Sequence, residues 1–497
     1  MNLKAVVFTA GAVSMAVEIT GLRLLAPYFG TSLPIISSVI GVILVSLSIG
    51  YYVGGYLADK RPIEETLYAV CLFASVLVSA IPYVAYPAFT IAANALRNYS
   101  VGYFGLALVL TLILLSVPTV LLGMVTPLAV RIESKKIPQL GRSAGRLYAL
   151  STLGSLLGTF LPSFVLIPFI GSTKTFVLSG FMLALMSSLA WRRKLILTLP
   201  ALILIIMLVL PAPVKGLENV IYQKESPYYL IQVIERKDGL RLLTLDEGLG
   251  IQSVYTPGSV LTGEYFDVAL IGGLMTSPGK VLLLGTGGGT VASQYNFFHP
   301  ESQVTTVDID PEVLKTGVNY FGLNESRVRL VAQDARAFLA LDNGTYDVIL
   351  VDAYRPPYIP FHLATREFFR EVRGHLAPNG VLLINVNIAT PQDAHYQSLI
   401  ATVQAEFGRA YAIEMQKKSD WVMNRVILAS NSDIPLDIKG LTANASEAQE
   451  PLRGLYVRYL NGTRLLPQSS RSPYTDDKAP IEWDTDYLII TRIDSSF

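Results

Sequence analysis

The chain is poor in charge and almost free of cysteine. Charged residues make up 15% of its 497 residues, whereas a soluble domain usually carries about a quarter, so an ordinary soluble enzyme is excluded. The single cysteine, Cys71, excludes a disulfide framework and any cysteine-based metal cluster. The four histidines show no ligand spacing such as His-Glu-x-x-His, and we therefore expect no metal site. They are His299, His362, His375 and His395.

The few charges are unevenly spread. Residues 1–212 hold 14 Lys and Arg and 5 Asp and Glu, which leaves 25 and 33 of the totals of 39 and 38 to residues 213–497. The first part therefore has a net charge of +9 and the second a net charge of −8, so the overall +1 is the sum of one basic and one acidic part of the chain. No segment combines a basic face with interleaved aromatic residues, so we expect no nucleic-acid partner.

Residues 1–212 form a succession of apolar stretches of about twenty residues, the length that crosses a bilayer. We expect an α-helical transmembrane bundle of about seven spans, and the first is no removable signal peptide because more spans follow at once. Pairs of small residues four apart, Gly50 with Gly54 and Gly154 with Gly158, predict close helix packing. The stretches are 5–27, 35–57, 67–92, 103–128, 146–170, 174–191 and 195–212.

Two ionisable residues, Glu18 and Arg23, lie deep in the first stretch. Charges at such depth are costly and are often functional. A transport pathway would normally show more buried polar groups than this half offers. We therefore expect the two residues to pair, with each other or with a neighbouring helix, and to hold the bundle together.

After Pro211-Ala-Pro213 the pattern changes to short segments. Alternation over 228–256 predicts a small antiparallel β lid, and from Lys280 apolar strands alternate with helices. Such strands predict a parallel sheet covered on both faces, an α/β doubly wound, Rossmann-like domain. The predicted strands are 281–285, 304–309, 328–334, 346–352 and 380–386. The predicted domains are 1–212 (membrane), 213–275 (lid), 276–435 (Rossmann-like) and 436–497 (C-terminal extension).

Four strand ends carry candidate site residues, because ligands of this fold bind at the carboxyl ends of the strands. The glycine-rich run 285–289 lets the backbone approach a ligand closely. Asp308 is placed to accept the ribose hydroxyls and Asp334 an adenine amino group, and Asp352 ends the fourth strand. Each acid alone is equally well explained as a helix cap or turn residue, but four such ends in the right order are not.

With these motifs the sequence resembles the spermidine synthase family, the polyamine aminopropyltransferases, and more closely the branch with an N-terminal multi-span membrane region. In the membrane half the matching runs are EITGLRLLAPYFG (18–30) and GRLYALSTLGSLLGTFL (145–161). In the second half they are Ser226-Pro227-Tyr228, LDEGLGIQS (245–253), GEYFDVAL (263–270), the four strand ends and TDDKAPIE (475–482).

The resemblance implies a fold of the S-adenosylmethionine-dependent methyltransferase type and a role for each matching residue. Asp308 would hold the ribose and Asp334 the adenine of a decarboxylated S-adenosylmethionine donor. Asp352 would orient and deprotonate the attacking amine, with Tyr265 of the lid beside it. The donor would also contact Gly285, Gly287 and Gln252, and the substrate would contact Tyr265, Asp267 and Arg355.

The implied enzyme is a membrane-bound transferase of polyamine (spermidine) biosynthesis that moves an aminopropyl group to an amine and releases methylthioadenosine. Its donor is a co-substrate, and it needs no prosthetic group and no metal. Its partners are a small-molecule amine and the bilayer. The related soluble enzymes associate, so a homo-oligomer is one possible assembly.

The sequence departs from the family pattern at both amine sites. Where the family usually has an aspartate that contacts the donor's primary amine, this chain has Gly288, and the second acid after the fourth strand is Arg355. Phe266 and Tyr229 stand where the family has polar lid residues. The adenosine end is therefore preserved, whereas the sites for the donor's amine and for the acceptor are altered.

Three functions stay open. The missing acids are replaced by neighbours in a polyamine enzyme, for which the candidates are Glu264, Asp267, Asp476, Asp477 and Glu482. Alternatively, intact S-adenosylmethionine supports methyl or other alkyl transfer to a membrane lipid or another membrane-associated acceptor, since Arg355 would repel a polyamine and could pair with a phosphate. The third function is a non-catalytic sensor of an adenosyl ligand.

The side of the membrane is contested. Basic residues follow the second, fourth and sixth stretches, which predicts that these loops are cytoplasmic. A full seventh crossing at 195–212 would then put the second half outside the cell, whereas its nucleotide-like donor is cytosolic. We favour a cytoplasmic catalytic domain, with either an incomplete crossing between Pro200 and Pro211 or a miscounted stretch elsewhere.

Overall fold

The computed structural model describes most of the chain. Two compact units divide it: a helical unit, Met1–Leu217 with Lys224–Leu230 and Ile493–Phe497, and an α/β unit, Glu218–Gln223 with Ile231–Arg492. The described residues are 3–29, 33–98, 103–134, 140–191, 197–210, 218–246, 250–354, 359–388, 390–415, 423–432, 436–448 and 450–485.

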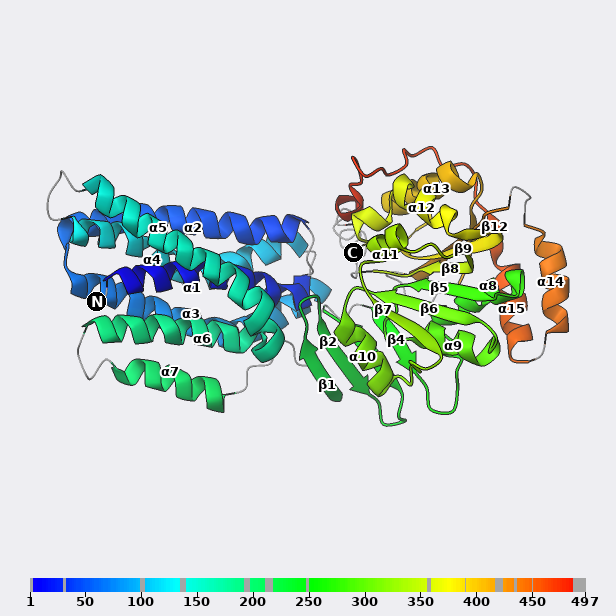
Figure 1. Ribbon diagram of the computed structural model, residues 1–497, viewed down its shortest axis with the longest axis horizontal. Coiled ribbons are helices and arrows are strands. Elements are labelled where there is room, and N and C mark those ends of the chain that lie inside the picture. Colours follow the sequence, from blue (N-terminus) through cyan, green and yellow to red (C-terminus); the bar gives the residue numbers. More distant parts are fainter. Residues whose placement is uncertain are drawn as a thin grey trace. The chain divides into compact units, whose positions relative to one another are not determined.

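The helical unit follows the predicted apolar stretches (Figure 1). Five described segments are long and apolar enough to cross a membrane, and the fifth, Gly141–Trp191, contains two of the predicted spans. Its chain breaks at Gly171, where φ is +83°, inside the gap predicted between 170 and 174. The helices are α1 (Leu3–Phe29), α2 (Leu33–Lys60), α3 (Glu64–Asn98), α4 (Tyr103–Glu133), α5 (Leu140–Leu161), the π-turn Pro162–Leu166, α6 (Ile167–Trp191) and α7 (Thr198–Val209).

The seventh stretch forms a helix too short to span a bilayer alone. Helix α7 has 12 residues, which at 1.5 Å per residue is about 18 Å, against a hydrocarbon core of about 30 Å. The described part of this stretch, residues 198–209, is therefore short, and an incomplete crossing at 195–212 stays a prediction.

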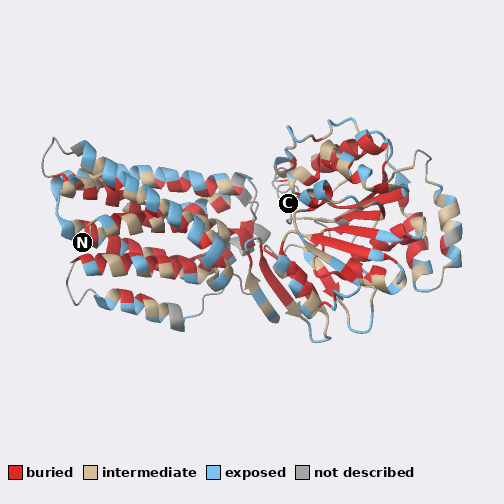
Figure 2. Ribbon diagram, viewed as in Figure 1, coloured by how far each residue is buried: buried red, intermediate tan, exposed pale blue. Residues whose placement is uncertain are grey.

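Small residues bring the helices of this unit together, as the sequence predicts. A Cβ at Gly154 or Gly158 in α5 would overlap the carbonyl oxygen of Phe8 or Ala12 in α1, and one at Gly50 in α2 would overlap the α4 backbone. Large apolar side chains point outward from the unit, where Figure 2 shows exposed residues around a buried interior. Such an outer surface suits lipid better than water.

Arg23 and the segment 224–230 meet at one end of the helical unit. The Arg23 guanidinium donates to the carbonyl oxygens of Ser226 and Tyr228, the latter at 2.9 Å. The carboxylate of Glu225 accepts from the backbone N–H of Ser172, at 3.0 Å, and from its hydroxyl, directly after the break at Gly171. The charge inside the first stretch therefore holds this segment on the helices.

The α/β unit begins with the predicted lid. Four strands form a sheet in the order β1-β2-β3-β4, with β2, β3 and β4 antiparallel neighbours. They are β1 (Val220–Glu225), β2 (Leu230–Glu235), β3 (Arg241–Leu245) and β4 (Ile251–Tyr255). A 3-10 helix, η4 (Tyr265–Leu270), and α8 (Ile271–Thr276) lead from the lid into the main sheet.

The main sheet has the order β12-β10-β11-β9-β8-β5-β6-β7. The five strands predicted from the sequence pair in parallel and are β5 (Lys280–Leu284), β6 (Gln303–Asp308), β7 (Val328–Ala332), β8 (Tyr346–Val351) and β9 (Leu376–Ile388). Three further strands complete the sheet in antiparallel fashion: β10 (Tyr411–Ile413), β11 (Met423–Ser430) and β12 (Thr463–Leu465). Because β12 belongs to the sheet, the boundary predicted at residue 435 lies inside one folded unit.

Helices cover both faces of this sheet, as continuous apolar strands require (Figures 1 and 2). One face buries against α11–α13 and the other against α8, α9 and α15. Strand order reverses at β5, with β6 on one side and β8 on the other, so a crevice is expected at the carboxyl ends of these strands. The helices are α9 (Thr290–Phe298), α10 (Pro311–Tyr320), α11 (Ala335–Leu341), α12 (Arg366–Gly374), α13 (Ala394–Phe407), α14 (Ile438–Glu447) and α15 (Leu452–Asn461).

Candidate functional site

The glycine loop after β5 is folded as only glycine allows. Gly285, Gly287 and Gly289 have φ of +101°, +52° and +85°, a region that side chains disfavour. A Cβ at Gly285 would overlap the carbonyl of Asp352 at the end of β8. The loop therefore lies directly against the strand end that carries the candidate base.

Asp308, at the end of β6, holds this loop from the other side. Its Oδ2 accepts from the backbone N–H groups of Thr286 (3.2 Å) and Gly287 (3.3 Å), and its Oδ1 accepts from Asp310 (3.0 Å). Burial raises the pKa of Asp308 to about 6, with the backbone hydrogen bonds opposing it. The carboxylate thus shapes the loop, and its predicted contact with a ribose stays a prediction.

Asp352 is a buried carboxyl with two side-chain donors. Asn385 in β9 donates from Nδ2 to Oδ1 at 2.9 Å, and the Tyr265 hydroxyl donates to Oδ2 at 3.3 Å. Burial raises the pKa of Asp352 to about 7, and these two hydrogen bonds act in the opposite direction. A carboxyl that is about half ionised near neutral pH suits a general base.

Tyr265 is held in η4 and does not compete for the proton. Its ring stacks on Phe266, with centroids 4.0 Å apart. Burial and the facing carboxylate raise the pKa of Tyr265 well above 10, so the phenol stays neutral and can only share its hydrogen with Asp352. The structure thus brings together the two residues that the sequence assigns to catalysis.

One pocket is lined by four of the predicted site residues. Its walls come from β4, η4, the glycine loop and the ends of β5 and β8. They include Gln252, Ser253, Phe266, Gly285, Gly287 and Asp352. Gln252, Gly285 and Gly287, which are predicted to contact the aminopropyl donor, and the predicted base Asp352 therefore line one pocket, where the strand order reverses.

Asp334 is a helix cap with a histidine partner. Its Oδ1 accepts from the backbone N–H groups of Arg336 and Ala337 at 3.0 Å each, which caps α11. Its Oδ2 lies 3.0 Å from Nε2 of His362, and this hydrogen bond lowers the pKa of Asp334. The cap interpretation is confirmed, whereas the adenine contact stays a prediction, and the sequence did not reveal His362 as a partner.

The motif TDDKAPIE is tied to the same corner of the sheet. Arg336 donates to both carboxylate oxygens of Asp476 at 2.7 Å and to Glu371 at 2.9 Å. The Thr365 hydroxyl also donates to Asp476, at 2.7 Å. Asp476 therefore anchors the C-terminal segment, and in this structure it is not free to replace an acid of the amine site.

Two predicted substrate contacts need comment. Asp267 is 3% exposed, and its carboxylate accepts from the backbone and hydroxyl of Thr262, the backbone of Gly263 and the amide of Gln294. It holds the turn before η4 and is not among the residues that line the Asp352 pocket, so its role in substrate binding stays a prediction. Arg355 lies outside the described residues.

Gly288 leaves no room for the family's acid. A Cβ there would lie 2.8 Å from Cγ of Phe321 and 2.9 Å from Cβ of Ser253. The backbone N–H of Gly288 donates to the Ser253 hydroxyl at 2.7 Å, which keeps the loop against β4. The absence of this aspartate is therefore built into the packing of the loop.

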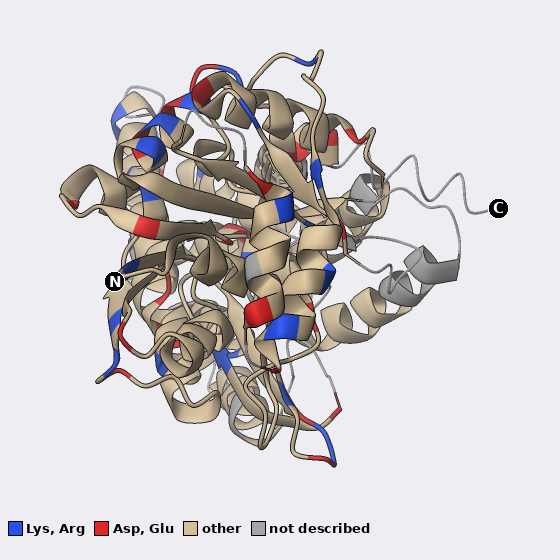
Figure 3. Cartoon of the chain, turned by 90° about the vertical axis from the view of Figure 1, so that its right-hand side faces the viewer, with Lys and Arg blue, Asp and Glu red and all other residues tan. Residues whose placement is uncertain are grey.

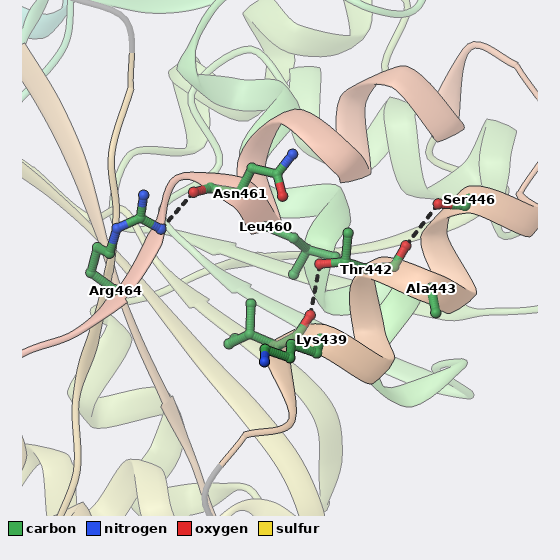
Figure 4. Close-up of a pocket in the computed structure, with 8 residues that line it drawn as sticks. Lys439, Thr442, Ala443, Ser446, Leu460, Asn461 and Arg464 are labelled. Atoms are coloured by element: carbon green, nitrogen blue, oxygen red, sulfur yellow. Dashed lines mark hydrogen bonds between the residues drawn. The ribbon is translucent and has the colours of Figure 1, made fainter.

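A second hollow lies between α14 and α15 (Figure 4) and is lined by Ile438, Lys439, Thr442, Ala443, Ser446, Leu460, Asn461 and Arg464. The hydroxyls of Thr442 and Ser446 donate to carbonyls of their own helix, and Arg464 donates to the carbonyl of Asn461. None of its walls is a carboxylate. On the face seen in Figure 3, basic and acidic residues are interspersed. Because the hollow between α14 and α15 has no carboxylate in its walls, the Asp352 pocket is the better candidate for the functional site.

Comparisons with known proteins agree with this location. The profile of the spermine/spermidine synthase domain matches residues 268–423, which include Asp308, Asp334 and Asp352. A probable polyamine aminopropyl transferase of Bifidobacterium longum is 32% identical over 282 residues, 53% of this chain and 62% of that protein. The polyamine aminopropyltransferase of Vibrio vulnificus is 33% identical over 229 residues, 44% of this chain and 75% of that protein.

Solved structures give weaker likenesses. A probable spermidine synthase from Corynebacterium glutamicum superposes with a TM-score of 0.40 at 18% identity, covering 54% of this chain and 93% of that one. The spermidine synthase of Thermotoga maritima gives 0.39 at 18% identity, covering 49% and 84%.

Proposed function

The chain belongs to the polyamine aminopropyltransferase family, and we propose that its α/β unit transfers an aminopropyl group from decarboxylated S-adenosylmethionine to an amine. The observation that carries the proposal is the buried Asp352 carboxyl. Its pKa of about 7 and its place between Tyr265 and the glycine loop suit a base that acts on a substrate amine.

The reaction needs little beyond a base and positioning. An ammonium has no lone pair for attack, so Asp352 first takes its proton. The free amine then attacks the propyl carbon bonded to the sulfonium, and the carbon–sulfur bond breaks with its electron pair going to sulfur. The neutral thioether, methylthioadenosine, leaves. Because the sulfonium is already an activated leaving group, holding the two reactants in line supplies most of the remaining acceleration.

The pocket beside the glycine loop supports a proposed place for the donor. We assign its adenosyl part to the glycine loop, with Gln252 and Asp308 beside it and Asp334 at the adenine end. Gly285 and Gly287 present backbone without side chains to this space. The contacts of Gln252, Gly285 and Gly287 are supported by their common pocket, and those of Asp308 and Asp334 rest on the resemblance.

The membrane assignment rests on the helical unit. Five described segments are long and apolar enough to span a bilayer, and we propose a multi-pass membrane protein in the cell membrane. Its substrate partner is a small amine that reaches the α/β unit from solution. A homo-oligomer stays a prediction.

The test is turnover by the purified full chain in detergent. Decarboxylated S-adenosylmethionine is offered with putrescine or a longer polyamine, and methylthioadenosine release is measured. We expect release that depends on both substrates. If the protein binds methylthioadenosine but turns over the donor with none of the amines offered, the result would instead support the sensor.

One observation favours a second function. No acid fits at Gly288, so an attraction for the donor's amine is missing, and so is a repulsion against the carboxylate of intact S-adenosylmethionine. The second candidate is therefore methyl or alkyl transfer from intact S-adenosylmethionine to a membrane lipid. Calorimetric titration with the intact and the decarboxylated donor separates the two, because only the second candidate requires the intact donor to bind at least as tightly.

A further inference from the structure

One partner of Asp352 is an amide that is itself held by another amide. Asn385 is 3% exposed, and its Nδ2 donates to Oδ1 of Asp352 at 2.9 Å. Asn424, in β11, donates from Nδ2 to Oδ1 of Asn385 at 3.0 Å. In the antiparallel pair β9–β11, Asn385 lies opposite Val426, so Asn424 is its diagonal neighbour, a separation that side chains bridge.

These two bonds decide which end of the Asn385 amide faces the base. Its oxygen accepts from Asn424, so its amino group is turned to Asp352. An amino group of this kind can only donate, and a donor stabilises the ionised carboxylate over the protonated one. Asn385 therefore opposes the effect of burial on Asp352.

The same bonds also distinguish the two oxygens of the carboxylate. Oδ1 accepts a short hydrogen bond from a buried amide, whereas among the described residues Oδ2 accepts only the longer hydrogen bond of 3.3 Å from Tyr265. Among the described residues, the titratable groups that face Asp352 are Tyr265 and Tyr354. Burial raises the pKa of both well above 10, so neither changes charge where Asp352 titrates.

We propose that Asn385, oriented by Asn424, is a positioning residue that fixes Oδ1 of Asp352 and leaves Oδ2 to take the proton from the acceptor amine. This inference rests on the proposed function. It extends the site by two residues from strands outside the pocket lining, and it assigns the proton to one named oxygen.

The first test compares pH–rate profiles of Asn385→Ala and Asn424→Ala. Without the donated hydrogen bond the pKa of Asp352 rises, so we expect the acid limb of kcat/KM to move up by about one pH unit in Asn385→Ala. At neutral pH, kcat should fall about fivefold, with little change in KM for the donor. In Asn424→Ala the acid limb should move in the same direction but by less, because the Asn385 amide remains and only its orientation is lost.

Asn431, directly after β11, offers a matched control. The Asn431 amide donates to the carbonyl oxygens of Leu376 and Ala377 at 3.1 and 3.2 Å. Asn431→Ala should lower stability without moving the pH profile. An unchanged profile in Asn385→Ala, or an equal shift in Asn431→Ala, overturns the proposal.

A second readout needs no turnover. The folded pKa of Asp352 lies above its unfolded value, so its contribution to stability is full below the unfolded pKa and is lost as pH rises through the folded pKa. Asn385→Ala raises the folded pKa further, so its thermal unfolding midpoint should fall behind that of the native chain more at pH 8 than at pH 5. An equal deficit at both pH values contradicts the positioning role, whereas this shift without any aminopropyl turnover rejects only the proposed function.

Discussion

At the scale of single residues, the pKa values of the two carboxyls of the site depend on two opposing effects, burial and a few donated hydrogen bonds. Burial alone disfavours a charged carboxylate, and both Asp308 and Asp352 have raised pKa values, about 6 and about 7. Backbone donors moderate the first and side-chain donors the second. The residue held by backbone thus shapes a loop, while the one held by side chains is poised to exchange a proton.

We predict that kcat/KM rises with pH through about 7, the pKa of Asp352, because only the ionised form accepts a proton. Asp352→Asn keeps the shape but removes the base, and should lower kcat by about 10² to 10⁴. Steady-state kinetics between about pH 5.5 and 8.5 check both points. Activity of Asp352→Asn close to that of the native chain would remove Asp352 from the mechanism.

Asp308→Ala should weaken binding of methylthioadenosine by at least about tenfold, because the glycine loop loses its acceptor and the ribose its proposed partner. Asp347 offers a matched control at the opposite end of β5. Its carboxylate likewise accepts from two backbone N–H groups, those of Gly279 and Lys280. Asp347→Ala should leave affinity unchanged in calorimetry; unchanged affinity in Asp308→Ala would refute the nucleotide assignment.

At the scale of elements, contacts of very different kinds join the segments. In the helical unit α1 and α5 approach until backbone meets backbone, which only small residues permit. In the α/β unit a bidentate Arg336–Asp476 pair ties the last segment to the start of α11. The contact between α1 and α5 tolerates no added atom, whereas the Arg336–Asp476 pair depends on geometry and charge.

Gly154→Ala should therefore destabilise the helical unit, by about 1–3 kcal/mol, since the added methyl meets the Phe8 carbonyl. Gly145→Ala, in the same helix, is the control: a Cβ there meets nothing within 4 Å. Thermal unfolding in detergent compares the two variants. Equal stability would show that α1 and α5 pack differently from the contact described.

At the scale of the whole molecule, the two ends of α1 have different charged contacts. Lys4 lies 3.9 Å from Glu133, where α1 begins and α4 ends. Arg23 lies 19 residues further along α1, about 28 Å at 1.5 Å per residue, and binds the carbonyls of Ser226 and Tyr228. The segment 224–230 therefore lies at the end of α1 opposite the Lys4–Glu133 pair.

The positive-inside rule alone places the segment 224–230 on the non-cytoplasmic side, whereas the cytosolic donor of the proposed reaction favours the cytoplasmic side, which we expect. Cys71 is buried, so single cysteines introduced by Leu33→Cys, Pro227→Cys and Lys60→Cys can be labelled with a membrane-impermeant maleimide. Labelling of the first two and not the third in intact cells would contradict the cytoplasmic placement. The reverse pattern would place the segment, and the chain that continues from it, in the cytoplasm.

The sequence by itself determined everything that rests on periodicity and chain order. Long apolar stretches must be helices in lipid, and continuous apolar strands between helices must form a parallel sheet. Parallel strands bring their carboxyl ends to one edge, so Asp308 and Asp352 had to approach the glycine loop. Local geometry was enough to predict the break near Gly171, the loop itself and the lid.

Only the tertiary structure decided which side chains meet across neighbouring elements. Strands β10 and β12 have three residues each, too few for a periodic pattern. Asp267 seemed as available as Asp352 in the sequence, yet one is fully engaged by a turn and the other faces a pocket. Asn385 reaches Asp352, and Asn424 reaches Asn385, through the register of three strands far apart in the chain. Such pairings depend on the order of strands in space, on which the spacing of residues along the chain carries no information.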